Sequence, residues 1–222
     1  PPHPLRQVRR RPVMSRRGLS KWTLLALVFA GMLLLDQATK YLAVGRLTNA
    51  FRAYRAEAVG ERLKVFYGAR HLERFAREPY VVWKPAWRMN YVENPGAAWG
   101  LFRGLSESAR NLFFTAISLG AVGFILHYYR KLQERQRFLQ VALAFVLTGA
   151  VGNFVDRLAR GYVVDFVEWH WWNRPDLRWP TFNVADSPTG GGVAMLVLFP
   201  SPARRPAGAA GGSGNNPPAP RL

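Results

Sequence analysis

The sequence predicts an all-α integral membrane protein with four transmembrane helices. Two observations predict this fold class. The 222 residues are 49% hydrophobic and yet carry a formal net charge of +18, because long apolar runs alternate with strongly basic segments. About 20 apolar residues are enough to cross the hydrocarbon core of a bilayer, which is about 30 Å thick. A nucleic-acid-binding domain would account for the charge but not for apolar runs of this length.

Four apolar runs are candidates for the membrane crossings. Residues 22–44 (WTLLALVFAGMLLLDQATKYLAV) would extend about 34 Å as a helix, and residues 109–129 are also long enough. Residues 138–155 form a shorter but adequate third run. The fourth, 185–199, is short and contains glycines 190–192, so we expect an irregular or mobile first turn there. Because glycine costs a helix about 1 kcal/mol relative to alanine, we expect Ala, Ile and Leu at these three positions to stabilise the protein.

The basic residues between these runs predict the orientation. Short cytoplasmic segments of membrane proteins are enriched in Lys and Arg, and three segments fit that rule. They are residues 1–21, residues 130–137, and Arg204 with Arg205. Residues 45–108 and 159–184 then lie outside. Segment 45–90 is an exception, with ten Lys or Arg residues against four Glu, but long external segments follow the rule only weakly.

This pattern divides the chain into three parts. We expect a basic cytoplasmic segment 1–21, a membrane domain 22–199 with an external insertion 45–90, and a disordered tail 200–222 rich in Pro, Gly and Ala. The N-terminal SRRGLSK, followed by an apolar run, also resembles a cleavable or twin-arginine signal. The run continues past a typical signal peptide and no small-x-small site follows it, which favours a retained helix. Met14 is an alternative start residue.

Polar residues inside the apolar runs form two groups. Asp36 and Lys40 lie four positions apart, so they share one helix face and can pair. Asn153, Asp156 and Arg157 also share one face, near the end of the third run. Ionisable groups at membrane depth are expensive unless they face protein or water. Each group therefore has either a packing role or a direct role in function.

Two further acids, Asp165 and Asp186, stand at the edges of apolar stretches, 21 positions apart. Two close carboxylates that share one proton can activate water and protonate a leaving amine, which is sufficient for peptide hydrolysis. The chain contains no cysteine, and its four histidines show no metal-ligand spacing. Thiol chemistry is therefore excluded, and we expect no metal and no cofactor. The alternative for Asp186 is a helix cap, with Pro188 in the first turn.

Five motifs, in this order, resemble those of lipoprotein signal peptidase, the bacterial signal peptidase II. They are DQATK (36–40), NPGAAWG (94–100), GNFVDR (152–157), VVDF (163–166) and FNVAD (182–186). The resemblance covers residues 22–44 and 90–187. It implies an aspartyl peptidase with Asp165 and Asp186 as the catalytic pair. It also implies supporting roles for Asp36, Lys40, Asn94, Asn153, Asp156, Arg157 and Asn183.

The same resemblance implies a fold and a substrate. Members of the family have four membrane helices, a small extracytoplasmic β-layer and a loop that covers the active site. They cleave prolipoproteins just before a lipobox cysteine that already carries a diacylglyceryl group. The expected location is therefore the bacterial inner membrane, with the active site toward its extracytoplasmic face. We expect a monomer that contacts membrane lipids and prolipoprotein substrates, and no nucleic-acid partner.

The segment between Lys40 and Asn94 is a departure from the family, because its 54 positions exceed what a compact member uses. Four of its residues fall on one helical face with Arg and Glu opposite. They are Leu47, Phe51, Tyr54 and Ala58. This pattern predicts an amphipathic helix that lies on the membrane. A solvated helical insertion is the alternative.

The aromatic segment and the set of acids each allow two interpretations. The tryptophans of segment 159–184 form either an interfacial aromatic belt or a lid that contacts lipid. They are Trp169, Trp171, Trp172 and Trp179. The alternative function is a small proton-coupled transporter with Asp36, Asp156, Asp165 and Asp186 as its relay. A relay places carboxylates at several depths, whereas these acids fall near one end of their helices, which favours the peptidase.

Overall fold

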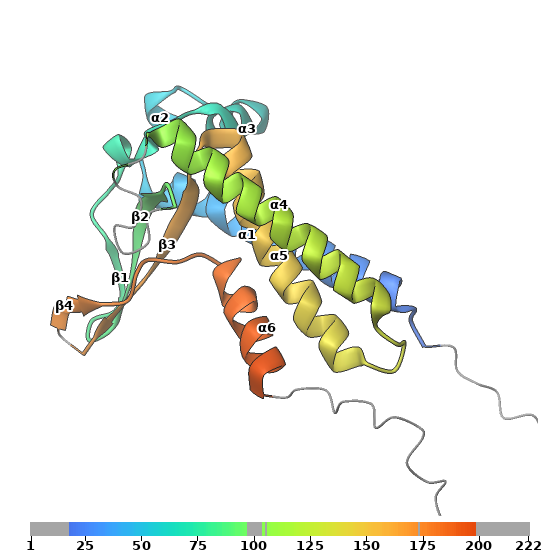
Figure 1. Cartoon of the computed structure of the whole chain (residues 1–222). Coiled ribbons are helices and arrows are strands. Elements are labelled where there is room, and N and C mark those ends of the chain that lie inside the picture. The colour runs from blue at the N-terminus through green and yellow to red at the C-terminus, as the bar shows by residue number, and fades with distance from the viewer. Residues whose placement is uncertain (1–17, 97–103, 105, 173, 199–222) are drawn as a thin grey trace, which may run out of the picture.

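A computed structural model describes residues 18–96, 104, 106–172 and 174–198 of the chain. Three long helices form the body of the molecule, and a small antiparallel sheet lies at one end of them (Figure 1). Residues 1–17 of the expected cytoplasmic segment 1–21 and all of the expected tail 200–222 lie outside the described residues, as does the NPGAAWG motif beyond residue 96.

The three long helices agree with the first three predicted runs. Within the described part of the chain, the helices long and apolar enough to cross a membrane are α1 (Lys21–Leu47), α4 (Glu107–Lys131) and α5 (Arg137–Arg160). The fourth run corresponds to α6 (Asp186–Leu198), whose 13 residues fall short of that length. The start of α1 is capped by Ser20, whose Oγ accepts a hydrogen bond from the amide of Thr23 at 3.1 Å. A glycine with φ of 86°, Gly161, ends α5.

Large apolar side chains cover the outside of the long helices. Leu34, Leu112, Phe124 and Leu158 are 72%, 71%, 70% and 71% exposed. A soluble protein rarely leaves so many large apolar residues in water, whereas a helix in a bilayer must present them to lipid. The exposure of these side chains therefore supports the membrane assignment.

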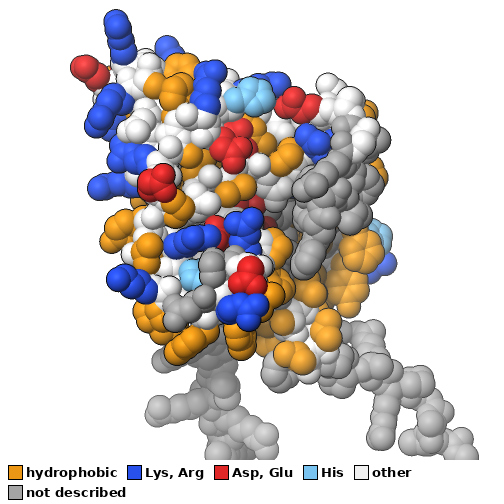
Figure 2. Space-filling view, turned by 90° about the vertical axis from the view of Figure 1, so that its left-hand side faces the viewer, with side chains coloured by type: hydrophobic (Ala, Val, Ile, Leu, Met, Phe, Trp, Pro, Cys, Tyr) orange, Lys and Arg blue, Asp and Glu red, His pale blue; other side chains and the backbone are white. Residues whose placement is uncertain are grey.

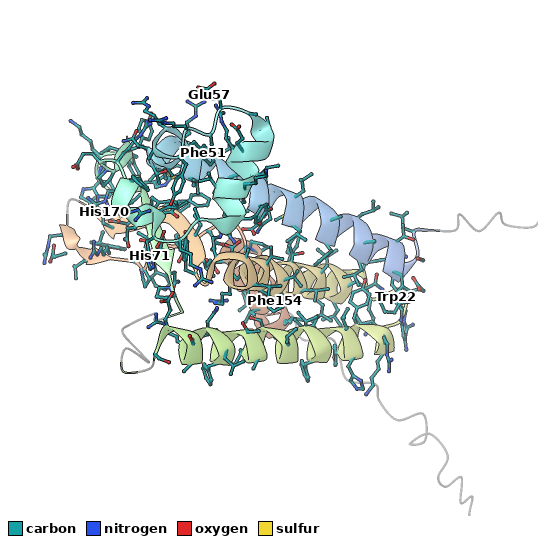
Figure 3. All side chains as sticks on the ribbon, turned by 90° about the horizontal axis from the view of Figure 1, so that it is seen from above. Trp22, Phe51, Glu57, His71, Phe154 and His170 are labelled. Carbon is teal, nitrogen blue, oxygen red and sulfur yellow. The ribbon has the colours of Figure 1, made fainter. Side chains whose placement is uncertain are left out.

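Two clusters of buried apolar residues hold the molecule together, one toward each end. The end labelled by Trp22 in Figure 3 is joined by residues of α1, α4 and α5. These residues include Leu25, Ile125, Tyr129, Leu143 and Leu147. The opposite end, labelled by Phe51 and His170, is joined by residues of α1, the insertion and the sheet. These include Val44, Leu47, Phe66, Leu72, Tyr91 and Phe166.

The α6 helix is continuous from Asp186 to Leu198, so the predicted irregular first turn is wrong, and the mobility that we expected as its alternative stays a prediction. It packs closely against α5 at one glycine. A Cβ atom on Gly192 would lie 2.6 Å from the carbonyl oxygen of Ala142 and 2.7 Å from Cγ2 of Val146. Glycines 190 and 191 instead face open space. The expected gain from replacing all three glycines is therefore restricted to the first two, because a side chain at the third collides with α5.

The β-layer implied by the resemblance is confirmed as a four-stranded antiparallel sheet in the order β1-β2-β3-β4. The strands are β1 (Tyr80–Trp83), β2 (Trp87–Asn94), β3 (Val163–Trp171) and β4 (Arg174–Arg178). The β2–β3 pairing sets Val92 opposite Asp165 and Asn94 opposite Val163, after a register shift that begins at Met89. This register brings the start of the NPGAAWG motif beside the VVDF motif.

The single amphipathic helix predicted through residues 47–58 is wrong. After α1 ends at Leu47, the chain forms α2 (Ala50–Ala53), α3 (Val59–Gly68) and a short 3-10 helix, η1 (Leu72–Phe75). Arg55 has φ of 52°, a left-handed conformation that interrupts a helix. The helical pattern failed because its members have different environments: Leu47 is buried, whereas Tyr54 is 42% exposed.

The aromatic segment 159–184 contains the hairpin of β3 and β4. Trp169, Trp171, Trp172 and Trp179 are all exposed, and Trp169 also stacks against Trp87 with ring centroids 6.0 Å apart. The exposed rings lie at the end of the molecule that carries the sheet. This placement is compatible with both interpretations of the tryptophans, a belt at the membrane surface and a contact with lipid.

Candidate active site

Five elements of the fold bring the polar residues of the motifs into one cluster. Residues from α1, β2, α5, β3 and the start of α6 are linked there by a continuous set of hydrogen bonds and ion pairs. All nine predicted site residues contribute: Asp36, Lys40, Asn94, Asn153, Asp156, Arg157, Asp165, Asn183 and Asp186. The sheet register and the α5–α6 packing are therefore what assemble the site.

Asp165 is the more buried of the two central acids. Its side chain extends from β3 and is only 2% exposed. The Asn94 Nδ2 donates to one carboxylate oxygen at 2.8 Å, and the Asn183 Nδ2 donates to the other at 2.6 Å. Burial, and then the nearby charge of Asp186, raise the pKa of Asp165 to about 7, although the two hydrogen bonds act in the opposite direction. Near neutral pH this carboxyl is therefore able to hold or release a proton.

Asp186 is the first residue of α6 and is half-buried. The Asn153 Nδ2 donates to its Oδ1 at 2.9 Å, and the backbone amide of Asn183 donates to its Oδ2 at 3.0 Å. The helix itself is capped by Asn183, whose Oδ1 accepts hydrogen bonds from the amides of Ala185 at 2.8 Å and Asp186 at 3.2 Å. The carboxylate of Asp186 is thus not the cap of α6.

Asn183 connects the two acids through a single fully buried side chain. Its Nδ2 donates to Asp165 and, at 3.2 Å, to the Oδ1 of Asn153, while its Oδ1 caps the helix that begins with Asp186. The position of Asp165 is therefore tied to the start of α6. A neutral amide is suited to this role because it fixes both acids without adding a charge between them.

A buried ion network lies behind the two acids. The Lys40 Nζ is 2.9 Å from a carboxylate oxygen of Asp36 and 2.9 Å from one of Asp156, and Arg160 pairs with Asp156 at 2.6 Å. All four side chains have 0% exposure, so two cations balance two anions. Lys40 also donates to the Oδ1 of Asn153 at 3.1 Å. Among the described residues Lys40 forms no direct hydrogen bond or ion pair with Asp165 or Asp186, which favours the packing interpretation of the Asp36–Lys40 pair.

Arg157 lies at the edge of the cluster. Its guanidinium is 5.2 Å from the centre of the Phe114 ring, and it donates to the carbonyl oxygen of Asn153 at 3.4 Å. The Nε atom is buried and has no hydrogen-bond partner among the described residues. A cationic donor with unused capacity near two acids is available to bind an oxygen atom of a ligand.

Two members of the cluster, Gln37 and Arg160, are not among the residues predicted from the sequence. The Gln37 Nε2 donates to Asp36 at 3.0 Å and to Asp156 at 3.1 Å, and Arg160 completes the charge balance. Gln37 is part of the DQATK motif, and Arg160 follows Asp156 by four positions, so both were detectable. The four carboxylates form one cluster and not a series at several depths, which weighs against the transporter.

Comparison with known proteins identifies the family of this chain. Residues 28–200 match the family described as signal peptidase (SPase) II. A lipoprotein signal peptidase of Anaeromyxobacter sp. (strain Fw109-5) is 68% identical over 186 residues, which are 84% of this chain and 88% of that protein. One of Syntrophus aciditrophicus (strain SB) is 35% identical over 181 residues, covering 81% and 94%. A solved structure described as a bacterial membrane enzyme aligns with a TM-score of 0.55 at 25% identity, covering 79% of this chain and 90% of that one. The chain therefore belongs to the signal peptidase II family.

Proposed function

We propose that this chain is a membrane aspartyl endopeptidase that removes signal peptides from diacylglyceryl-modified prolipoproteins, cutting just before the lipidated cysteine. The names of its relatives support the substrate class. One observation carries the mechanism: Asp165 and Asp186 are held by the same asparagine, and burial together with the charge of Asp186 raises the pKa of Asp165 to about 7. The pair then shares one proton near neutral pH.

The shared proton divides the work between the two acids. The ionised carboxylate removes a proton from a water molecule as the water oxygen attacks the carbonyl carbon of the scissile bond. The protonated carboxyl donates its proton to the carbonyl oxygen, and a tetrahedral intermediate forms. When the C–N bond breaks, the acid that collected the proton of the water transfers it to the leaving amine. At the same time a hydroxyl of the intermediate returns its proton to the other carboxylate, which restores the shared proton. The products are a free signal peptide and a lipidated amino terminus.

The remaining residues of the cluster position the acids and the substrate. Asn94, Asn153 and Asn183 orient the carboxylates by the hydrogen bonds described above. We assign to Arg157 the binding of a substrate carbonyl oxygen, since its Nε has no hydrogen-bond partner within the described residues. The network of Asp36, Lys40 and Asp156 serves as a rigid support between α1 and α5.

The proposed topology has four crossings, with α6 as the fourth. The start of α1, the turn between α4 and α5 and the far end of α6 lie toward one end of the molecule, away from the sheet (Figure 1). We place that end in the cytoplasm and the cluster toward the extracytoplasmic face of the bacterial inner membrane, with residues 22–199 as the peptidase domain. Lipid surrounds the exposed apolar side chains, and the working unit is a monomer.

The test is a cleavage assay on the purified full chain. A diacylglyceryl-modified prolipoprotein should lose a mass equal to that of its signal peptide, and the same prolipoprotein without the lipid serves as the control substrate. Asp165→Asn and Asp186→Asn should each abolish cleavage and remain folded, because neither acid alone supplies both proton transfers. Near-normal turnover by either variant refutes the mechanism. Absence of cleavage by the parent chain refutes the function.

A further inference from the structure

The external insertion carries an excess of positive charge that the peptidase mechanism does not use. Five arginines line one cavity of about 570 Å³, where the insertion meets the last turns of α1. They are Arg46, Arg52, Arg55, Arg62 and Arg77, with Glu57 as an acidic neighbour. Figure 2 shows Lys and Arg side chains gathered over the upper part of the face that it draws, the level at which α2 and α3 lie in Figure 1.

These arginines are not neutralised by the protein. Within the described residues, none of the five takes part in an ion pair. Two of them are held in place by neutral groups: the Arg62 Nε donates to the carbonyl oxygen of Ala56 at 3.2 Å, and the Arg77 Nε donates to the Oδ1 of Asn49 at 3.1 Å. The cavity therefore presents five guanidinium groups against the one carboxylate of Glu57, and two of the five are oriented by neutral groups, which suits a phosphate oxyanion.

An apolar groove of about 630 Å³ adjoins this cavity. Leu42, Arg46 and Arg77 line both, and the groove continues over Met89 and Phe166 of the sheet. The two hollows together have one strongly basic part and one apolar part. A phospholipid has the same two parts, because its phosphate-bearing headgroup suits the basic part and its acyl chains suit the apolar part. A free phosphate ion suits only the basic part.

The position of the cavity on α1 fits the depth of a lipid leaflet. Leu35 and Leu42 are 48% and 55% exposed, and their spacing of seven positions places them on one face of α1. Arg46 follows on the same face, four positions later. From Leu35 to Arg46 the helix rises about 16 Å, close to half of the roughly 30 Å hydrocarbon core. An acyl chain along the two leucines would thus end at the arginines.

We propose that this cavity binds the phosphate-bearing headgroup of an anionic phospholipid, with an acyl chain along Leu35 and Leu42. None of the nine candidate active-site residues lines the cavity, so the site is separate from the two acids. The proposal also accounts for the ten basic residues of segment 45–90. Their place outside the membrane violates the positive-inside pattern because part of this charge serves lipid binding.

Native mass spectrometry of the full chain in detergent tests the proposal. The protein is titrated with phosphatidylglycerol, which is anionic, and with phosphatidylcholine, which carries a phosphate but no net charge. The parent chain should bind phosphatidylglycerol more tightly. Each basic residue near an anionic lipid changes the binding constant for that lipid about fivefold. Arg46→Gln with Arg52→Gln should therefore weaken phosphatidylglycerol binding about thirtyfold, and Arg55→Gln alone should weaken it about fivefold.

The matched control is Arg174→Gln with Arg178→Gln, which removes the same charge from exposed β4, and neither of these residues lines the cavity. This variant should keep the affinity of the parent within about twofold if binding is local to the cavity and not a response to net charge. Equal losses in the two double variants, or equal affinity for both lipids, overturn the proposal. Displacement of the lipid by millimolar inorganic phosphate would assign the cavity to a soluble anion and overturn it as well.

Discussion

Replacing Gly192 by alanine should loosen the contact between α6 and α5 that holds Asp186 in place. The new Cβ atom would lie 2.6 Å from the carbonyl oxygen of Ala142, whereas an ordinary contact begins near 3.4 Å. The helix must therefore move away by about 0.8 Å, and overpacking of this kind costs about 1–3 kcal/mol. Gly191→Ala is the matched control, because it adds the same methyl group to the same helix at a position that faces open space.

The two variants share the gain in helix propensity, so their difference isolates the packing term. For a chain of this size 1 kcal/mol corresponds to about 2–4 °C in melting temperature, so Gly192→Ala should melt about 2–12 °C below Gly191→Ala. A rigid shift of 0.8 Å would also lengthen the 2.9 Å hydrogen bond from Asn153 to Asp186 beyond bonding distance. Cleavage of a lipid-modified prolipoprotein should therefore slow in Gly192→Ala and not in Gly191→Ala. Equal melting temperatures, or full activity of Gly192→Ala, refute this account of the helix contact.

Three further predictions concern the charge network, pH and topology. Lys40→Met leaves the buried Asp36 and Asp156 with one cation fewer, which should lower the free energy of unfolding by about 3–5 kcal/mol. A melting temperature within about 2 °C of that of the parent, measured by differential scanning fluorimetry, contradicts this prediction. Because the pKa of Asp165 is raised from 3.8 to about 7, the folded state binds more protons than the unfolded state between these pH values, so unfolding free energy should fall as pH rises through that window. The cleavage rate should likewise fall above pH 7 as the pair loses its shared proton, by up to about tenfold per pH unit, and a flat profile to about pH 9 is incompatible with the two-acid mechanism. In this cysteine-free chain, a membrane-impermeant maleimide applied to intact cells should label Trp171→Cys and not Arg135→Cys, and the reverse pattern inverts the topology.

Local sequence patterns predict the parts of the fold that depend on local chemistry. The long helices follow from runs of apolar residues, and the pairing of Asp36 with Lys40 follows from the helical repeat. Asp165 and Asp186 can be identified as site residues because carboxylates are unusual at the edges of apolar stretches. The sheet is not visible in the sequence as such, and its prediction rests only on the resemblance to a family.

The predictions that failed depend on contacts between distant positions. The glycine run predicts a weak helix at Gly192. That prediction misses the packing of Gly192 against Ala142 and Val146, because these residues lie about 50 positions away in the chain. The apolar repeat that begins at Leu47 predicts one helix. In the structure Leu47 is instead the last residue of α1 and is buried in the core. The omission of Arg160 has a different cause, because its contact with Asp156 is local, but the motif that identifies the other residues ends at Arg157.

The dependence of the site on α6 has a consequence for biosynthesis. The ribosome makes α1, the sheet and α5 before it makes the segment from Asn183 onward, so the earlier elements exist for a time without their last partner. In that interval Asp165 lacks both the Asn183 amide that orients it and the second acid, and Asp36 lacks the Ala185 amide that donates to it at 3.1 Å in the finished protein. Under the proposed mechanism a nascent chain is latent, and a chain that terminates early stays so. Synthesis of the segment from Asn183 onward thus acts as the activation step.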